Sequence, residues 1–458
     1  MSVLLIQPPF YTNKAEELAM KTIHHPSIGL ACIEAVLNKN DVAARIIDLN
    51  IKPWEYVFQE IQKNNIKIVG ITGYTFIASK MVDISKKIKK EFPNIIIVGG
   101  GVHASYYYKE LLTKHSFDFI IRFEGEFPFL HLCNEILNST HNYRSVKNLA
   151  FKDGLEIIKT GIDEAIENLD NLPQTNIDLS DYPNKAVPIQ VSRGCPYQCI
   201  YCSSSAYWGK KIRYRSIERI KEEIIKHKQK GYTTFSFIDD QLNASENHFL
   251  QLMNMMIDTN IVWYGACVVN KLRKEHLDLL KKSKCQGLNI GIESADSNIQ
   301  KIIGKEINLE HAYDIIKYAQ KIGIKIVCGF ILFHHCDTNE SLKKTIEFSK
   351  KIQGTGARAR FTYNTPFQGT YQYKKKTDLG IEIVSDNFDD FDLSNPVINT
   401  RYFKKSEMRS VFDISDMNTS EVNFSKIQTI LQDHNITNPN DPRLNVEFIQ
   451  KIILDHLK

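Results

Sequence analysis

Three cysteines lie close together near the middle of the sequence. Cys195, Cys199 and Cys202 have the spacing C-x3-C-x2-C and follow the apolar run 186–191. An apolar run that ends at Arg-Gly is typical of a buried strand leading into a loop. Three thiolates this close can bind one face of a cubane iron–sulfur cluster, and because no fourth cysteine lies nearby, one iron would keep an open position. An open iron suits a catalytic cluster better than an electron carrier.

The same cysteines could instead bind zinc or form a disulfide. Structural zinc usually takes four ligands from two paired knuckles. Disulfides are rare in reducing compartments, and the apolar stretch within residues 1–7 is too short for a secretion signal. The spacing therefore favours the cluster.

The spacing, with Tyr201 directly before the third cysteine, resembles the radical S-adenosylmethionine (SAM) superfamily. The resemblance implies a 4Fe–4S cluster on Cys195, Cys199 and Cys202, with SAM chelating the open iron. It also implies that Tyr201 contacts SAM.

Bulk composition predicts a cytoplasmic protein of two or three domains. The chain has 458 residues, 43% of them hydrophobic and 24% charged, with a net charge of +5. Basic runs such as 86–90 have helical periodicity, which predicts a solvated helix face and no nucleic-acid partner. No apolar stretch reaches the roughly 18 residues that a membrane span requires. Nine scattered cysteines fit a reducing cytosol.

The first third of the chain alternates apolar runs with segments of helical period, which predicts a doubly wound, Rossmann- or flavodoxin-like domain. We expect strands at 3–6, 43–47, 66–71, 95–98 and 119–121, and helices at 28–38, 54–64, 77–92, 106–113 and 126–137. Ligands of such sheets bind beyond the carboxyl ends of the strands. The residues expected there are Thr72, Gly73, Tyr74, Gly99, Gly100, Gly101, Val102, His103, Glu124, Gly125 and Glu126.

This set of residues resembles the cobalamin-binding domain found ahead of many radical SAM barrels. The resemblance implies that these residues contact cobalamin. No Asp-x-His-x-x-Gly stretch is present to supply a histidine beneath the cobalt, so we expect no such ligand and interpret His103 as a polar lining residue. A flavin or nucleotide site, or a domain without a ligand, are the alternatives, because glycine-rich loops are weak signals alone.

Six further strand–helix units predict a partial TIM-like barrel, (β/α)6, with its chemistry at the carboxyl ends of the strands. Its strands are expected at 186–191, 235–238, 262–269, 287–292, 324–332 and 358–363. We divide the chain into a cobalamin-binding domain (1–140), a hairpin and linker (141–185), the barrel (186–372) and a helical substrate-recognition cap (373–458). Helices are expected in the cap near 404–413, 421–433 and 443–457.

Two strand ends carry further candidate SAM contacts. Asp239 and Asp240 follow the second barrel strand and could face the ammonium group of SAM. Glu293 and Ser294 end a Gly-Ile-Glu-Ser stretch that resembles the family signature, which implies contacts to the ribose or methionine end. The Pro-x-x-Gly-Thr stretch at 366–370 resembles the family pattern after the last strand.

The loop after the fifth barrel strand departs from the family pattern. Family members often carry Gly-x-Ile-x-Gly and then Pro-Gly-Glu, whereas this chain has Phe333-His334-His335-Cys336. We expect a solvent-facing loop. The alternative is a catalytic role in proton or hydrogen transfer, for which Cys336 and His335 are the candidates.

The resemblance implies a cobalamin-dependent radical SAM enzyme, and we expect a methyltransferase acting on an unactivated carbon. In that family a 5′-deoxyadenosyl radical abstracts hydrogen and methylcobalamin supplies the methyl group. Alternatives are a rearrangement, cyclisation or ring contraction with the same cofactors, a first domain that only docks a partner, and a non-catalytic cobalamin sensor. The expected partners are a small-molecule or peptide substrate and an electron donor such as flavodoxin or ferredoxin.

Overall fold

The computed structural model describes residues 2–10, 24–162 and 165–411. The chain divides into two compact units, Met1–Lys185 and Ala186–Lys458, each of which is described by itself. No helix among the described residues is long and apolar enough to cross a membrane.

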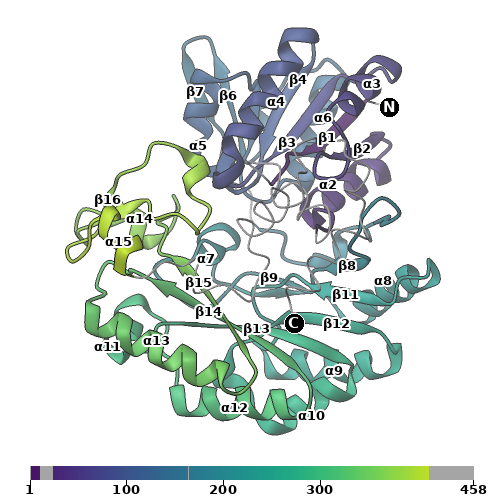
Figure 1. Cartoon of the computed structure of the whole chain (residues 1–458). Coiled ribbons are helices and arrows are strands. Elements are labelled where there is room, and N and C mark those ends of the chain that lie inside the picture. The colour runs from purple at the N-terminus through teal and green to yellow at the C-terminus, as the bar shows by residue number, and fades with distance from the viewer. Residues whose placement is uncertain (1, 11–23, 163–164, 412–458) are drawn as a thin grey trace, which may run out of the picture. The chain divides into compact units, whose positions relative to one another are not determined.

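The first unit, purple to blue in Figure 1, is built on a sheet of seven described strands in the order β2-β1-β3-β4-β5-β6-β7. Its parallel strands are β1 (Val3–Gln7), β2 (Ala44–Asp48), β3 (Ile68–Thr72), β4 (Ile96–Gly100) and β5 (Phe119–Ile121). An antiparallel hairpin, β6 (Leu149–Asp153) and β7 (Glu156–Lys159), extends the sheet. The hairpin forms where two apolar runs flank Asp153-Gly154, as the sequence predicts.

Helices cover both faces of this sheet. Side chains of α3 (Glu55–Lys63), α4 (Ala78–Glu91) and α5 (Gly101–Lys114) pack into one apolar cluster, and those of α2 (Ile28–Lys39) and α6 (Glu126–Leu137) into another. The expected doubly wound domain is confirmed.

One helix boundary was predicted wrongly. Helix α5 begins at Gly101 and not at 106, because Gly101 has a φ of 86° and turns the chain from β4 directly into the helix. A side chain would be strained in this left-handed conformation.

The second unit, teal to green, contains six described parallel strands in the order β15-β14-β13-β12-β11-β8. They are β8 (Ala186–Ile189), β11 (Thr234–Phe237), β12 (Val262–Ala266), β13 (Cys285–Glu293), β14 (Lys325–Leu332) and β15 (Arg358–Tyr363). The connecting helices are α8 (Ile217–Gln229), α9 (Glu246–Thr259), α10 (Lys274–Lys282), α11 (Ser297–Ile303), α12 (Leu309–Lys321) and α13 (Asn339–Gln353). The predicted partial (β/α)6 barrel is confirmed.

Strand β8 forms one edge of this sheet within the described chain. The Ile189 carbonyl accepts a hydrogen bond from the Ile238 amide at 3.0 Å, so the backbone of Ile189 faces β11. The preceding residue, Pro188, therefore directs its backbone nitrogen away from the sheet, which is where proline is tolerated in a strand.

A short antiparallel pair, β9 (Ser192–Arg193) and β10 (Arg213–Tyr214), brackets the cysteine loop, by which we mean residues 194–203. Helix α7 (Ser204–Trp208) follows the loop. Gly194 has a φ of 103°, and a Cβ atom there would lie 2.2 Å from the Lys211 carbonyl oxygen. The close approach of two backbones therefore requires glycine at the start of the loop.

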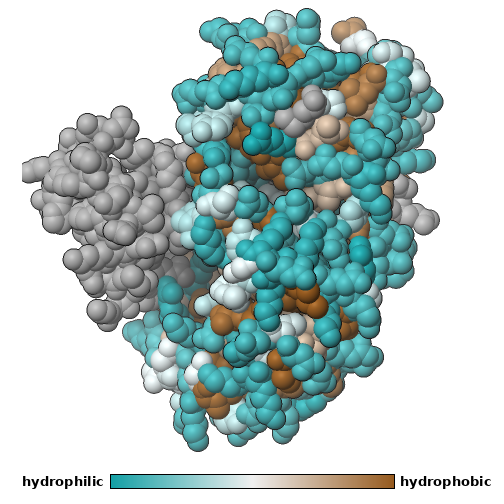
Figure 2. Space-filling view, turned by 90° about the vertical axis from the view of Figure 1, so that its right-hand side faces the viewer, coloured by the Kyte–Doolittle hydropathy of each residue, from teal (hydrophilic) through white to brown (hydrophobic). Residues whose placement is uncertain are grey.

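After the barrel come α14 (Tyr371–Lys374), the pair β16 (Glu382–Ile383) and β17 (Ile398–Asn399), and α15 (Lys405–Val411). The last matches the helix predicted near 404–413. The helices predicted near 421–433 and 443–457 lie outside the described residues. On the face seen in Figure 2, hydrophilic side chains predominate and apolar ones form separate small patches.

Candidate active site

The cysteine loop lies at the carboxyl end of β8, and all three of its cysteines are partly exposed free thiols. The Cys195 amide donates to the Gly209 carbonyl at 3.2 Å and the Cys202 amide to that of Cys199 at 3.1 Å. The end of α11 holds the middle of the loop, because the Ile200 amide donates to the Ile303 carbonyl at 3.0 Å. The backbone thus fixes the loop independently of a metal.

The donor set fits an iron–sulfur cluster. Among the described residues, no three His, Cys, Asp or Glu side chains are close enough to hold a single metal ion, whereas a cubane binds each thiolate at a different iron. Burial raises the pKa of the Cys195 thiol to about 11 and also raises that of Cys199. Positive charge from iron would therefore be needed to hold both as thiolates at neutral pH.

Tyr201 connects the cysteine loop with the end of β13. It lies close enough to the Cys199 thiol and to the Glu293 carboxyl group to lower the pKa of each. Burial raises the pKa of Glu293, while Lys305, whose Nζ is 3.8 Å from Oε1, opposes that shift. The carboxyl group folds back over Gly291, where a Cβ atom would lie 2.2 Å from Oε1. The structure thus brings together Tyr201 and Glu293, two of the predicted SAM contacts.

The two aspartates have different surroundings. Buried Asp239 accepts hydrogen bonds from the backbone amides of Val191 and Ser192 and, at 2.6 Å, from the Ser192 hydroxyl. Its carboxylate therefore holds the chain between β8 and β9, and burial raises its pKa to about 6. Asp240 is exposed and accepts from the Ser204 hydroxyl at 2.6 Å. A SAM contact remains a prediction for both, and Asp240 has the freer carboxylate.

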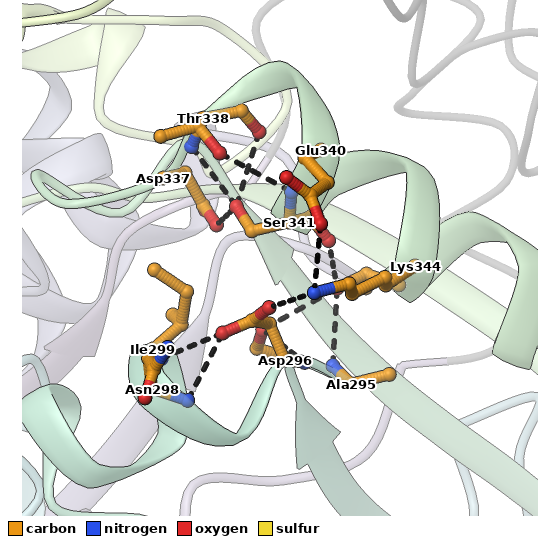
Figure 3. A network of polar contacts seen from close by, with 11 residues as sticks. Ala295, Asp296, Asn298, Ile299, Asp337, Thr338, Glu340, Ser341 and Lys344 are labelled. Atoms are coloured by element: carbon orange, nitrogen blue, oxygen red, sulfur yellow. Dashed lines mark hydrogen bonds and ion pairs between the residues drawn. The ribbon is translucent and has the colours of Figure 1, made fainter.

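The Ser294 hydroxyl accepts a hydrogen bond from the amide of Asp296, which belongs to a polar network that joins the starts of α11 and α13 (Figure 3). The Gln300 side chain donates to the Ser294 carbonyl at 2.6 Å, and the Ser294 hydroxyl lies 3.3 Å from that of Thr345. Lys344 bonds Asp296 at 2.9 Å in the same network. Ser294 is buried and positions the turn after Glu293, and its predicted contact with SAM stays a prediction.

The expectation of a solvent-facing loop at 334–336 is wrong. His334 and His335 are buried, and Cys336 is only partly exposed. Asp337 pulls the loop inward, because its carboxylate accepts from the His334 amide at 2.8 Å and from the Ser341 hydroxyl at 2.6 Å. Burial raises the pKa of the Cys336 thiol to about 12, so this thiol is protonated at neutral pH. Catalytic roles for Cys336 and His335 stay predictions.

Two polar residues at strand ends were missed by sequence reasoning. Gln241 follows β11, is buried, and donates its side-chain amide to Cys195 Sγ at 3.4 Å. Asn364 follows β15 and is also buried. One indication of both residues was available in the sequence, namely that each is polar and follows a predicted barrel strand.

In the first unit, the glycine triplet is not the open loop that the sequence suggested. A Cβ atom on Gly99 would lie 2.6 Å from the Ile120 side chain, and one on Gly101 would lie 2.7 Å from Thr72 Oγ1, whereas one on Gly100 would meet nothing within 4 Å. Gly100 is therefore the point of the triplet where a bulky ligand can approach the backbone. Next to it, Gly73 precedes the exposed Tyr74.

His103 is buried within α5, where its ring stacks on Tyr107 at 4.5 Å. Burial lowers its pKa to about 3. Its amide donates to the Gly73 carbonyl at 3.1 Å, which fixes the start of α5 beside the end of β3. Val102, the residue before it, is partly exposed in the same first turn.

The predicted acidic residues of this edge are both buried, Glu124 before Gly125 and Glu126 after it. The Glu124 carboxylate accepts from the Ile166 amide at 2.8 Å and so ties the connector to the sheet. Sequence reasoning also missed a buried cluster at the ends of β1 and β2. There Asp48 accepts from Tyr182 at 3.0 Å and pairs with His24 at 2.7 Å.

Two family models match the chain. The radical SAM superfamily matches residues 189–349 and the B12-binding domain matches residues 20–132. The chain is thus a radical SAM protein with a B12-binding domain ahead of the barrel. The predictions of a cobalamin-dependent radical SAM enzyme and of its cofactors, a 4Fe–4S cluster, SAM and cobalamin, are confirmed.

Curated relatives span much of the chain. An uncharacterized methyltransferase of Pyrococcus horikoshii is 29% identical over 424 residues, which is 89% of this chain and 90% of the relative. A bacteriochlorophyllide d C-12(1)-methyltransferase of Chlorobaculum tepidum is 25% identical, over 71% of this chain and 69% of its own. An anaerobic magnesium-protoporphyrin IX monomethyl ester cyclase of Cereibacter sphaeroides is 23% identical, over 76% of this chain and 58% of its own.

Two solved structures share the fold. The radical SAM methyltransferase TsrM of Kitasatospora setae, solved with cobalamin and a 4Fe–4S cluster, has a TM-score of 0.71 at 15% identity, over 84% of this chain and 78% of its own. The cobalamin-dependent SAM radical enzyme OxsB, solved with aqua-cobalamin and SAM, has a TM-score of 0.74 at 16% identity, over 99% of this chain and 71% of its own.

Proposed function

We propose that the protein transfers a methyl group to an unactivated carbon of a small-molecule substrate. The observation that carries this proposal is the cysteine loop, whose Cys199 lies close to Tyr201 and Glu293 at the carboxyl edge of the barrel sheet. The B12-binding domain and a methyltransferase relative that matches 89% of the chain support methyl transfer over other radical reactions.

In this proposal Cys195, Cys199 and Cys202 hold the cluster, and Tyr201 and Glu293 contact SAM. When bound, the cluster and SAM supply an organic radical and cobalamin supplies a methyl carrier. The chain positions these groups. The Asp239 carboxylate fixes the strand before the loop, and Gly100 leaves room for cobalamin at the edge of the first sheet.

Cyclisation with the same cofactors is the second candidate function. The observation that favours it is the similarity to a magnesium-protoporphyrin ester cyclase, at 23% identity over 76% of the chain. A cobalamin sensor is disfavoured by the cysteine loop, because a sensor has no need of an open iron. A peptide substrate is the alternative to a small molecule, and an external electron donor such as flavodoxin or ferredoxin would reduce the cluster.

The test is anaerobic reconstitution of the full chain with iron, sulfide and hydroxocobalamin, followed by desalting and metal analysis. We expect about four irons, as the cluster type requires, and one cobalt per chain. Under reducing conditions with SAM, we expect 5′-deoxyadenosine together with S-adenosylhomocysteine, the product that remains when SAM gives up a methyl group. The matched control Cys199→Ala should lose iron and 5′-deoxyadenosine but keep cobalt.

The outcomes separate the candidates. 5′-Deoxyadenosine without S-adenosylhomocysteine would contradict methyl transfer and favour cyclisation or rearrangement. Iron without cobalt would remove the methyl carrier from the proposal. Retained 5′-deoxyadenosine in Cys199→Ala would contradict the cluster assignment.

A further inference from the structure

The imidazole of His334 lies at the carboxyl edge of the barrel sheet, two residues beyond the end of β14. The residue is fully buried, and neither ring nitrogen has a hydrogen-bond partner among the described residues. Its ring lies 5.4 Å from that of Tyr201, the side chain that contacts Cys199 and Glu293. An unsatisfied buried imidazole is costly in free energy, so its presence at this edge requires an explanation.

The backbone that positions the His334 ring is strained and is held by hydrogen bonds. Phe333, the residue between β14 and His334, has a φ of 64°, a strained conformation for a bulky side chain. Such strain concentrates at functional sites and persists only where the surroundings enforce it. Here Asp337 holds the His334 amide at 2.8 Å, and the polar network of Figure 3 anchors Asp337 through Ser341.

A second unsatisfied group follows the neighbouring strand. The Asn364 amide donates to the Leu332 carbonyl at 2.9 Å, which sets Asn364 beside the end of β14. Asn364 is 2% exposed, and neither its side-chain oxygen nor its side-chain nitrogen has a partner among the described residues. Adjacent strand ends thus present an imidazole and a carboxamide without partners.

Burial without a hydrogen-bond partner does not by itself identify a ligand-binding residue. His227 on α8 is also fully buried, and both of its ring nitrogens are unpaired among the described residues. Helix α8, however, is not at the carboxyl edge of the barrel sheet. Three features distinguish His334 from His227: its ring lies near Tyr201, the backbone just before it is strained at Phe333, and Asn364 is its neighbour. His227 therefore serves as a matched control.

The chemistry of the two groups defines the ligand. Burial lowers the pKa of His334 to about 3, so the imidazole is neutral and offers one donor and one acceptor. Asn364 likewise offers both and carries no charge. They suit a neutral, flat edge that pairs a donor with an acceptor, such as the amino group and ring nitrogen of adenine. The charged methionine end of SAM does not have this character.

We propose that His334 and Asn364 hydrogen-bond the adenine of SAM. This inference rests on the proposed function, which places SAM over Tyr201. It makes both residues determinants of cofactor specificity.

The test measures SAM affinity of the anaerobically reconstituted full chain, followed through the electron paramagnetic resonance spectrum of the reduced cluster. The variants are His334→Phe and Asn364→Leu, which keep side-chain volume, with His227→Phe as control. Loss of hydrogen bonds to the ligand predicts about tenfold weaker SAM binding for each variant, with no change for the control. Thermal midpoints should stay equal or rise, because each substitution removes an unsatisfied buried polar group.

A second experiment tests whether the two side chains contact the purine of SAM. S-inosylmethionine, which carries a carbonyl where SAM has the adenine amino group, should bind the wild type more weakly than SAM. That preference should shrink in both variants.

SAM affinity within twofold of wild type in both variants would overturn the inference. A fall in thermal midpoint that accompanies the lost affinity would also overturn it, because it would show a structural role. Failure of the wild type itself to bind SAM would instead contradict the proposed function.

Discussion

Some residues of the candidate site can be predicted from the sequence and others cannot. The three cysteines stand out because cluster chemistry restricts their type and spacing, and Glu293 stands out because it belongs to a stretch that resembles the family signature. Gln241 and Asn364 could not, because single amides after apolar runs are common and only their burial at the sheet edge distinguishes them. The sequence also could not show that the Asp239 carboxylate is already satisfied by backbone amides.

The contact between Gln241 and Cys195 predicts an effect on the cluster's reduction potential. Hydrogen bonds to the coordinating sulfurs stabilise the reduced, more negative cluster. Removing one in Gln241→Leu should lower the potential by about 20–40 mV, which corresponds to about 0.5–1 kcal/mol for one electron. A redox titration monitored by electron paramagnetic resonance measures this shift.

Gln372→Leu is the control for this prediction. Gln372 is also a buried glutamine of the second unit, but its side-chain amide donates to the Thr365 carbonyl. Its contact with the cysteine loop is made by its backbone amide, which donates to the Ile200 carbonyl and is kept in the leucine variant. Equal potentials in wild type and Gln241→Leu would show that the contact does not act on the cluster.

At the level of elements, apolar periodicity predicted most of the helices and strands because each buries one face or both. Strand β15 begins and ends at the expected residues. The start of α5 was missed because periodicity does not report a glycine turn, and the loop at 334–336 was misplaced because its burial depends on Asp337, three residues from His334. The spacing of apolar residues does not show whether a short-range side-chain hydrogen bond of this kind forms.

The β9–β10 pair predicts that the cysteine loop is sensitive to substitution at Gly194. In Gly194→Ala the new Cβ would lie 2.2 Å from the Lys211 carbonyl oxygen at a φ of 103°. We expect a loss of about 1–3 kcal/mol in stability and reduced iron content after reconstitution, measured by thermal unfolding and iron analysis.

Gly231→Ala is the matched control. Gly231, which follows α8, also has a positive φ, 90°, but its Cβ would meet nothing within 4 Å, so only the conformational cost of about 1–2 kcal/mol applies. If both variants lose iron equally, contact with Lys211 is not what shapes the loop.

For the whole molecule, composition predicted two or three domains, and we expected a cobalamin-binding domain, a linker, a barrel and a cap. The chain divides into two compact units after Lys185. The connector could not be predicted in detail, because its attachment depends on single contacts such as that of Glu124 with Ile166. The division into units predicts that cobalt and iron binding can be lost separately.

Gly100→Leu tests this separation from the side of the first unit. The glycine has extended backbone geometry with a φ of −147°, which leucine tolerates, and its Cβ would point into open space. We expect at least tenfold less retained cobalt, because the side chain would occupy the ligand's place, with iron content and thermal midpoint unchanged. Undiminished cobalt would show that cobalamin does not approach Gly100.

Strand β8 has a consequence for association between molecules. A strand edge without a partner strand is a template for pairing with another chain and for aggregation. All four residues of β8 are buried in the folded chain, so this edge can meet another chain only before folding is complete. Pro188 directs its backbone nitrogen away from β11 and has no amide hydrogen to donate. A strand added there would lack one hydrogen bond of its ladder, so this residue protects the incompletely folded sheet against pairing with a second copy.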